Sequence, residues 1–379
     1  MKKLITLFIL AAAITIAACS NGTTKEKPEA AATPPMPVLK VGIDPMDVLV
    51  LEQDTFHVPS WLDKGIKGRT LVRISAVDGL SAIAPDNMGA IKDAALKSAD
   101  MDALANMGNA LWKDKPLYST ENTVYVAHQL GIVDRVYWVV PRFGSITHEG
   151  FQEFKQYLLK ASPGQRKDVD SLVLNGKLVE GTFDGMPVTF VGLQDLPALD
   201  GPVLLQVDIS FLSTLYMNEK STRILALVSG FFDTLKKSGI KSDCVTVVTS
   251  NANGLVPVKF RFLAGYLASM FKDPALIAKD PPALWSESAE AWLIEQKSPK
   301  ESIAVYKDIL KKYPEVAATH YDLSYAYFMV NELESCRKEL AEAARLDPGY
   351  ESGYAEFAAA LREDGKKAEA EGFLASSAR

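Results

Sequence analysis

The C-terminal region, residues 283–379, repeats one pattern of apolar and small residues at a constant spacing. Pro314 and Pro348 stand 34 residues apart and mark this spacing. A period of this length is typical of a supersecondary unit that stacks on its neighbours, because one unit alone cannot bury its apolar face. The spacing therefore predicts an all-α repeat domain in which each proline ends the second helix of an antiparallel pair.

The residues within each frame carry a family resemblance. A frame that starts at Ala317 places at its marker positions His320, Leu323, Ser324, Tyr327, Cys336, Leu340, Ala343 and Pro348. The tetratricopeptide repeat fills these positions with Trp, Leu, Gly, Tyr, Ala, Phe, Ala and Pro, and the chain resembles that family most in its apolar and small sites. The next frame, from Glu351, includes Tyr354, whereas the frame from Ala283 fits less well in its first helix.

The resemblance to tetratricopeptide repeats implies two good repeats and one degenerate repeat. Stacked repeats of this kind form a concave surface that usually binds peptides or other proteins. We therefore expect a protein or peptide partner at the repeats. An alternative stays open, because so short an array can also serve only to pack on the domain that precedes it.

The N-terminus has the pattern of an exported lipoprotein. Lys2 and Lys3 precede an apolar run, Leu4–Ala18, that is shorter than the roughly 20 residues of a membrane-spanning helix. The run leads directly to Cys19 in the sequence IAAC, which resembles a lipobox. We expect a signal peptide at 1–18 and a lipid on Cys19; the alternative is an ordinary signal peptide cleaved near Ala18.

The predicted anchor also indicates where the protein resides. Several acyl chains hold a protein stably at a membrane, whereas one chain binds only marginally. Ser20 follows the cysteine, which resembles the outer-membrane sorting pattern of Gram-negative lipoproteins. Residues 19–36 have no large hydrophobe before Met36, so they predict a flexible tether. We expect a cell-envelope protein, lipid-anchored at the outer membrane and facing the periplasm.

The overall composition excludes some classes of protein. Of the 379 residues, 48% are hydrophobic and 23% are charged, which favours folded domains over a disordered chain. The net charge of −6 provides no basic excess to neutralise phosphates, so nucleic acid is not an expected partner. Cys244 and Cys336 are expected to be small buried hydrophobes; the alternative is a disulfide that joins two domains.

Short β-branched segments alternate with helical patterns across residues 37–280. The expected strands are Val48–Glu52, Thr70–Ser75, Val136–Pro141, Val203–Ile209 and Val245–Ser250. The expected helices are Asn87–Lys113 with a break near Asp100, Thr120–Leu130, Glu149–Ala161, Ser221–Ser238 and Val258–Phe271. Such alternation predicts an α/β domain with a three-layer, mostly parallel sheet. Residues 172–179 and 181–191 predict hairpins at an antiparallel edge or insertion.

Four segments resemble, in their order along the chain, the arginase/deacetylase-like metallohydrolase superfamily. They are Val48–Glu52, Leu71–Ser81, Leu204–Phe211 and Gly239–Ser250. The resemblance covers most of residues 45–272 and rests on this order rather than on one motif. It implies one or two divalent metals, held by an Asp-Ala-His-x-Asp and an Asp-x-Asp strand end, whose bound water attacks the scissile bond.

The ligand positions of that superfamily are almost all changed in this chain. Ser75, Val77 and Gly79 stand where the first strand end should offer Asp, His and Asp. At the second strand end, Asp208 matches the first acid but Ser210 replaces the next. Asp208 alone cannot hold a catalytic metal, so it is either a remnant ligand or a carboxylate that caps a loop.

Three other polar residues of the region stand out in the sequence. Arg73, inside an apolar strand, either pairs with an acid in the former metal site or lies on an edge strand. His57 is expected to be a surface or hydrogen-bonded histidine rather than part of a cleft. Asp78 followed by Gly79 predicts a turn. The chain has no HxxxH, HxH, CxxC or Gly-x-Ser-x-Gly sequence and no glycine-rich phosphate loop.

Together these observations favour a membrane-anchored lipoprotein that binds or scaffolds without catalysis. Its helical repeats and an inactive α/β domain would make the contacts, and no cofactor or metal is expected. The alternative is a metal-dependent hydrolase of C–N bonds in an amide or guanidino substrate, of the arginase/deacetylase type.

Overall fold

The structure is a computed structural model, and it describes most of the chain beyond residue 38. The described residues are 39–41, 47–96, 101–108, 116–141, 147–161, 165–218, 223–273, 276 and 281–377. The leader, Cys19 and the tether lie outside them, so the predictions about these parts stay predictions. Contacts divide the chain into Met1–Leu39 and Lys40–Arg379. Among the described residues, no helix combines the length and apolar character needed to cross a membrane.

The strands join in one nine-stranded sheet, in the order β1-β2-β9-β8-β3-β4-β7-β6-β5. They are β1 (Leu39–Val41), β2 (Asp47–Leu51), β3 (Arg69–Ile74), β4 (Val133–Val139), β5 (Val173–Asn175), β6 (Leu178–Phe183), β7 (Met186–Val191), β8 (Val203–Asp208) and β9 (Ser242–Val248). From β2 to β7 in that order, neighbours pair in parallel. The expected mostly parallel sheet is therefore confirmed.

The expected antiparallel edge is also confirmed. Strand β6 pairs antiparallel with β7 and with β5, the last strand of the sheet. Asp184 and Gly185 form the turn between β6 and β7 with φ angles of 48° and 83°. A two-residue hairpin turn of this kind needs positive φ at both positions, which an Asp-Gly pair tolerates.

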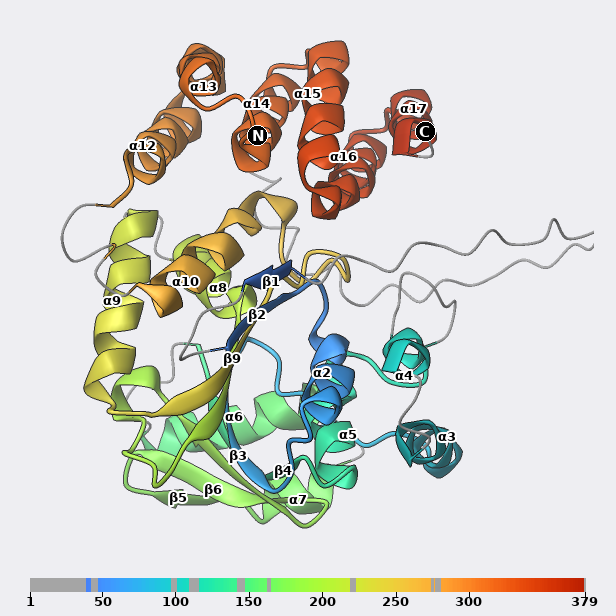
Figure 1. Cartoon of the computed structure of the whole chain (residues 1–379), viewed down its shortest axis with the longest axis vertical. Helices are drawn as coiled ribbons and strands as arrows, with labels where there is room; N and C mark the ends of the chain where they lie inside the picture. Colours follow the sequence, from blue (N-terminus) through green and yellow to red (C-terminus); the bar gives the residue numbers. More distant parts are fainter. Residues whose placement is uncertain are drawn as a thin grey trace, which may run out of the picture. The chain divides into compact units, whose positions relative to one another are not determined.

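Helices lie against both faces of the sheet (Figure 1). Leu71 and Leu204 point to the face that shares a buried cluster with α2, α5 and α6. Val72 and Leu205 point to the other face, which packs with α8, α9 and α10. Adjacent strand residues alternate in this way because successive side chains point to opposite faces. The helices are α2 (His57–Asp63), α5 (Thr123–Gln129), α6 (His148–Ala161), α8 (Ile209–Asn218), α9 (Ile224–Lys237) and α10 (Phe262–Lys272).

Several expected boundaries changed. The expected helix Asn87–Lys113 overlaps α3 (Pro85–Leu96) and α4 (Met101–Met107), and its expected break near Asp100 lies outside the described residues. Two other boundaries were wrong: Ile209 begins α8 instead of ending a strand, and Val258–Phe271 is not one helix. A 3-10 turn, η6 (Val258–Phe260), precedes α10 there, with Arg261 between the two elements.

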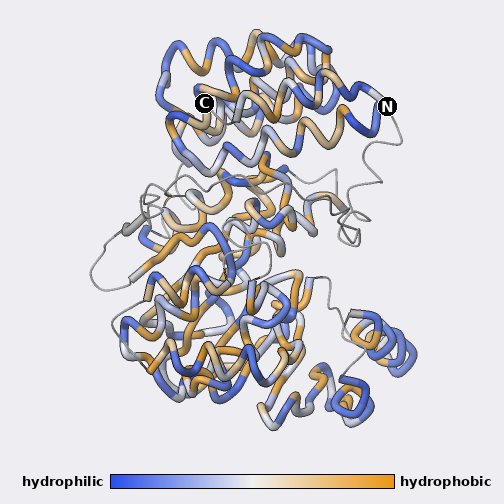
Figure 2. The backbone as a smooth tube through the Cα atoms, turned by 90° about the vertical axis from the view of Figure 1, so that its right-hand side faces the viewer, coloured by the Kyte–Doolittle hydropathy of each residue, from blue (hydrophilic) through white to orange (hydrophobic). Residues whose placement is uncertain are grey.

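The C-terminal region is a series of antiparallel helix pairs. They are α12 (Ala283–Lys297) with α13 (Pro299–Lys312), α14 (Ala317–Met329) with α15 (Leu333–Leu346), and α16 (Ser352–Glu363) with α17 (Lys367–Ser377). Pro314 and Pro348 each follow closely on the second helix of a pair. Hydrophilic and hydrophobic stretches alternate along these helices (Figure 2), and α13, α15 and α16 are clearly amphipathic.

The repeats and one face of the sheet share a continuous buried cluster. It runs from Val72 and Leu205 on the strands, through Leu267 on α10, to Trp292 and Leu323 in the repeats. The predicted boundary at residues 280–283 lies between α10 and α12, and the division into two domains stays a prediction. The repeats are therefore packed on the sheet part through apolar side chains, and this contact positions the site described next.

Candidate functional site at the inner face of the repeats

The carboxyl ends of β3 and β8 lie side by side, which the metallohydrolase resemblance requires. The two strands pair in parallel, with Ile74 opposite Val207. Beyond the strand ends, the Oγ of Ser210 accepts a hydrogen bond from the backbone N–H of Ala76 at 3.1 Å and lies 3.5 Å from the Oγ of Ser75. The two sequence motifs are thus in contact, but hydroxyl groups meet there instead of metal ligands.

Asp208 is buried at this strand end and both its carboxylate oxygens accept hydrogen bonds. One oxygen accepts the backbone N–H of Ser210 at 2.7 Å, and the other accepts the hydroxyl of Ser250 at 2.6 Å. Burial raises the pKa of Asp208, and the nearby charge of Asp54 raises it further. The bond to Ser210 caps the first turn of α8, which explains why the strand stops at Asp208.

A buried ion pair between Arg73 and Asp54 lies in the same part of the sheet. Arg73 is on β3, between β8 and β4, so the edge-strand interpretation was wrong and the pairing with an acid is confirmed. Its Nη1 and Nη2 lie 3.0 and 3.1 Å from the two carboxylate oxygens of Asp54. Burial pushes the pKa of Asp54 up, but Arg73 and His57 outweigh it and hold the pKa well below its usual range.

The residues at these strand ends do not fit a divalent metal. Within the described ranges, no group of three or more His, Cys, Asp or Glu side chains is placed to hold one. Arg73 already supplies the positive charge beside Asp54, and His57 is buried with its Nδ1 2.5 Å from the backbone oxygen of Asp54. Asp78 accepts the backbone N–H of Leu80 at 2.8 Å, which is the expected turn.

A second polar cluster lies where the repeats meet the sheet part. The first helices of the three pairs, α12, α14 and α16, contact η6, and we call this surface the inner face (Figure 1). The residues that the sheet part places against it are Val258, Lys259, Phe260 and Arg261, here named the basic segment. A segment of the chain itself thus covers part of the surface where a partner was expected.

Lys259 of the basic segment is held by a carboxylate and two aromatic rings. Its Nζ forms an ion pair with Glu295 of α12 and lies 4.6 Å from the ring centroid of Trp292 and 4.3 Å from that of Tyr325. Burial lowers the pKa of Lys259, but the carboxylates of Glu295 and Asp322 outweigh it and raise the pKa. Cation–π contacts are strongest when water is excluded, and the side chain of Lys259 is mostly buried here. Its contacts with the two rings are therefore specific interactions.

Arg261 joins strand β2 to the repeats. Its Nη1 and Nη2 donate to the two carboxylate oxygens of Glu52 at 2.6 and 2.5 Å. Its Nε and Nη2 donate to Asp347, between α15 and η7 (Pro348–Glu351), at 2.7 and 2.9 Å. Two paired contacts of a planar guanidinium fix orientation as well as distance, so Arg261 sets how the repeats meet the sheet part.

Around Lys259, the inner face carries more carboxylates than cations. Asp322 and Glu356 stand 34 residues apart, at the same place in successive repeats, and Glu295 lies on α12, the first helix of the preceding pair. Glu356 accepts the backbone N–H of Val258 at 2.8 Å. Burial raises the pKa of Asp322 to about 8 and that of Glu356 to about 7. One lysine therefore faces three carboxylates, of which two resist ionisation.

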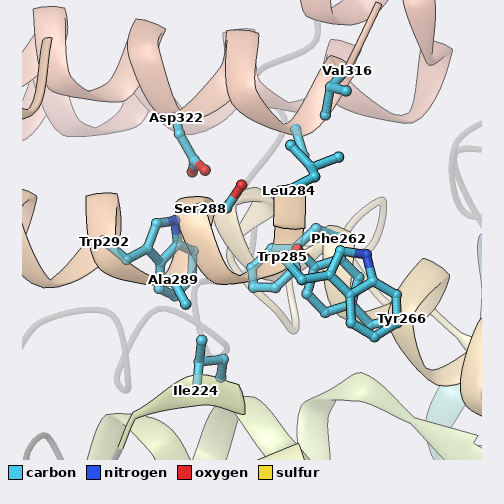
Figure 3. Close-up of a pocket in the computed structure, with 11 residues that line it drawn as sticks. Ile224, Phe262, Tyr266, Leu284, Trp285, Ser288, Ala289, Trp292, Val316 and Asp322 are labelled. Carbon is cyan, nitrogen blue, oxygen red and sulfur yellow. The ribbon is translucent and has the colours of Figure 1, made fainter. Parts of the chain in front are cut away.

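A pocket opens next to Lys259, between α10, α12 and α14 (Figure 3). It encloses about 40 Å³, and its wall includes Phe262, Tyr266, Trp285, Ser288, Trp292 and Asp322. Trp285 stacks on Tyr266 with ring centroids 3.8 Å apart. Asp322 points from α14 toward α12, so the mostly aromatic wall carries one carboxylate. Trp292 and Asp322 both line this pocket. The ring of Trp292 also contacts the Nζ of Lys259, and the charge of Asp322 raises the pKa of Lys259.

The marker residues of the repeats lie in the interior of the helix pairs. Those in the buried cluster are Leu323, Tyr327, Cys336, Leu340, Ala343 and Tyr354. Pro348 begins η7, and His320 has its Nδ1 2.7 Å from an oxygen of Glu339. Cys244 and Cys336 are both buried and are not joined by a disulfide, so the expected small buried hydrophobes are confirmed. These residues hold the repeats together and do not form the inner face.

Sequence interpretation missed the charged residues of the inner face and of the basic segment. They are Glu295, Asp322 and Glu356 on the inner face and Lys259 and Arg261 in the basic segment. One signal existed, because Asp322 and Glu356 repeat at the period of the helix pairs within otherwise apolar stretches. Lys259 and Arg261 gave no signal, since single charged residues among apolar ones also occur on the solvent-facing side of ordinary helices and strands.

The comparison with known protein families agrees with the helix pairs. A family model described as tetratricopeptide repeat matches residues 293–361, from within α12 to within α16. Neither the curated proteins nor the solved structures gave a match to the chain. The match omits most of α12, which belongs to the frame that fits least well. The C-terminal region of this chain therefore contains tetratricopeptide repeats, as its 34-residue spacing predicts.

Proposed function

We propose that this chain is a membrane-anchored lipoprotein that acts as a non-catalytic binding or scaffold protein through its repeats. Tetratricopeptide repeats are generally protein-interaction modules. One observation carries the proposal: the inner face holds the side chain of Lys259 with a carboxylate and two aromatic rings. A surface that binds a segment of the chain itself in this way has the side chains needed to bind a partner.

The architecture we propose is a three-layer α/β domain followed by an all-α repeat domain. The α/β domain would be an inactive relative of the arginase/deacetylase-like superfamily. The contact between the ends of β3 and β8 supports the relationship, and Ser75, Ser210 and the Arg73–Asp54 pair support the loss of activity. Such a domain serves as a rigid platform for the repeats, which Arg261 fixes to it.

Elemental analysis distinguishes this proposal from a metal-dependent hydrolase of C–N bonds. We expect the purified protein to contain far less than one equivalent of Mn, Zn or Fe, and added metal to leave its melting temperature unchanged. Near one equivalent of bound metal, together with hydrolysis of an amide or guanidino substrate, would overturn the non-catalytic reading. Arg73→Ala serves as the matched variant, because it removes the cation that competes with a metal beside Asp54.

The anchor is tested through Cys19. We expect the full chain to fractionate with the outer membrane and to carry acyl groups on Cys19 by mass spectrometry. Cys19→Ser should release the protein into the soluble fraction, whereas Cys336→Ser should remain at the membrane. An unmodified Cys19 in the mature protein would refute the lipid anchor without affecting the repeats.

Cross-linking in whole cells tests the binding role. We expect a discrete protein partner whose cross-links fall on residues 281–377, since these carry the repeats. Cross-links confined to the sheet part, or no stoichiometric protein partner, would count against a role for the repeats.

A further inference from the structure

We propose that the pocket between α10, α12 and α14 binds a lysine side chain of a partner protein, with the carboxylate of Asp322 as its counter-charge. This assignment rests on the proposed binding function and names the chemistry that the partner must present. It concerns the part of the inner face that lies beside the basic segment. The experiments below separate it from the wider proposal.

The chain itself demonstrates how this face recognises a lysine. Lys259 lies over the ring of Trp292 at 4.6 Å from the centroid and is paired with Glu295. The pocket continues from that contact, because Trp292 also forms part of its wall. The groups that hold Lys259 are aromatic rings and one carboxylate. The same kinds of group therefore line the neighbouring pocket, which is open to a ligand from outside.

The size and lining of the pocket suit the end of a lysine side chain. A volume of about 40 Å³ accommodates roughly three water-sized groups. The last two methylene groups and the ammonium of a lysine are three groups of that size. Phe262, Tyr266 and Trp285 offer apolar and aromatic contact to the methylene groups, and Ser288 offers a hydroxyl to the ammonium (Figure 3). Leu284 and Val316 are only partly buried, so a ligand can enter past them.

The charge balance of the inner face favours an added cation. Lys259 is paired with Glu295, and Arg261 is paired with Glu52 and Asp347. Asp322 is 4% exposed and accepts a hydrogen bond from the Trp292 side chain; the cation that attracts it is Lys259, which Glu295 already neutralises. An ionised Asp322 therefore leaves one unbalanced negative charge at the pocket wall. A partner lysine would restore the balance, which an uncharged side chain of the same length could not do.

The ionisation of Asp322 couples binding to pH. The titratable groups that act on it or feel its charge are Lys259, Glu295, Tyr266, Tyr306, Tyr321 and Tyr350. Burial raises the pKa of Asp322 to about 8, whereas a free lysine keeps its charge up to about pH 10. Affinity for lysine should therefore rise as pH rises through 8, because deprotonation of Asp322 creates the counter-charge.

A pair of short peptides provides the probe. The full chain is titrated with acetyl-Gly-Lys-Gly-amide and with the same peptide acetylated at the lysine Nζ, which keeps the length and removes the charge. Binding is followed by the NMR shift of the Trp292 indole N–H, with the buried indole of Trp138 as the reference signal. We expect the lysine peptide to shift Trp292 and to bind at least about tenfold more tightly than its acetylated form.

Two variants and one control test the roles of charge and space. Asp322→Asn should weaken the affinity for the lysine peptide to that for the acetylated peptide. It should also abolish the rise in affinity with pH. Ala318→Leu narrows the pocket with Asp322 intact and should abolish binding of both peptides. Asp308→Asn, which removes an exposed carboxylate of α13, should leave both affinities and the pH profile unchanged.

Equal binding of the two peptides, or full lysine affinity in Asp322→Asn, would overturn the assignment. So would an unshifted Trp292 in the unaltered protein. If Asp322→Asn does not fold, the pH profile of the unaltered protein and Ala318→Leu decide the question. A partner that cross-links to the repeats while no lysine peptide binds would overturn only the pocket assignment. If no partner cross-links to the repeats and no lysine peptide binds, the proposed binding function is overturned as well.

Discussion

The guanidinium group of Arg261 occupies the space that a side chain at Gly349 would need. A Cβ placed on Gly349 would overlap the Cζ and both Nη atoms of Arg261. These atoms cannot simply turn away, because Arg261 is held by Glu52 and Asp347 together. A single glycine after Pro348 thus permits the contact that fixes the repeats to strand β2.

Gly349→Ala should therefore destabilise the protein. The methyl group must displace a guanidinium that makes two paired contacts, so we expect a loss of about 2–3 kcal/mol in the free energy of unfolding. Urea unfolding followed by tryptophan fluorescence measures it. Gly265→Ala on α10 is the matched control, because a Cβ there meets no atom within 4 Å. That change should instead stabilise the helix by roughly 0.5–1 kcal/mol; equal effects of the two changes would contradict the role of Arg261.

Lys259→Met should weaken the contact between the basic segment and the inner face. Methionine keeps much of the apolar length but leaves Glu295 without its cation, so we expect a loss of about 3 kcal/mol at neutral pH. Thermal unfolding at neutral pH measures the loss. Lys311→Met, which removes an exposed partner of Asp308, should change stability little; an equally small effect of Lys259→Met would argue against the buried ion pair as a source of stability.

The strands and helix pairs could be predicted because their patterns are local. Runs such as Val203–Asp208 are buried along their whole length, so they appear in the sequence as segments that are apolar at most positions. The start of α8 could not be located in this way. Ile209 and Phe211 continue the apolar run of β8, and only the capping bond from Ser210 to Asp208 ends the strand. Periodicity cannot separate a buried strand from the first turn of a buried helix.

The inner face could not be predicted because its partners are distant in the sequence. Arg261 lies 209 residues from Glu52, and no pattern within one segment relates the two. Arg73 is a second example. The sequence shows a charged residue inside an apolar strand but does not show that Asp54 pairs with it. Local sequence thus identified Arg73 as a residue that needs a partner, but only the tertiary structure shows that the partner is Asp54.

Arg73→Met should be among the most destabilising single changes in the sheet. It leaves the buried carboxylate of Asp54 without its cation, which typically costs about 3–5 kcal/mol. Because the pKa of Asp54 is held below its usual range in the folded state, the pair contributes stability above about pH 4 that is lost as pH falls further. Chemical unfolding at neutral and acidic pH tests this, with Arg345→Met, which removes a surface pair, as the control. A double variant with Asp54→Asn should recover part of the loss; strict additivity would show that the two residues are not coupled.

The buried acids of the repeats should make the protein less stable as pH rises. Burial raises the pKa of Asp322 to about 8 and that of Glu356 to about 7 in the folded state, whereas unfolded acids titrate near about pH 4. The stability that protonation provides is complete below about pH 4 and is lost progressively up to the folded pKa values. Asp322→Asn, a neutral side chain of the same shape, should therefore raise the melting temperature above pH 8 and have little effect near pH 4. Asp308→Asn, at an exposed site, should not follow this profile. If Asp322→Asn destabilised the protein equally at both pH values, the carboxylate would be a structural ion pair with Lys259 rather than a group kept neutral by burial.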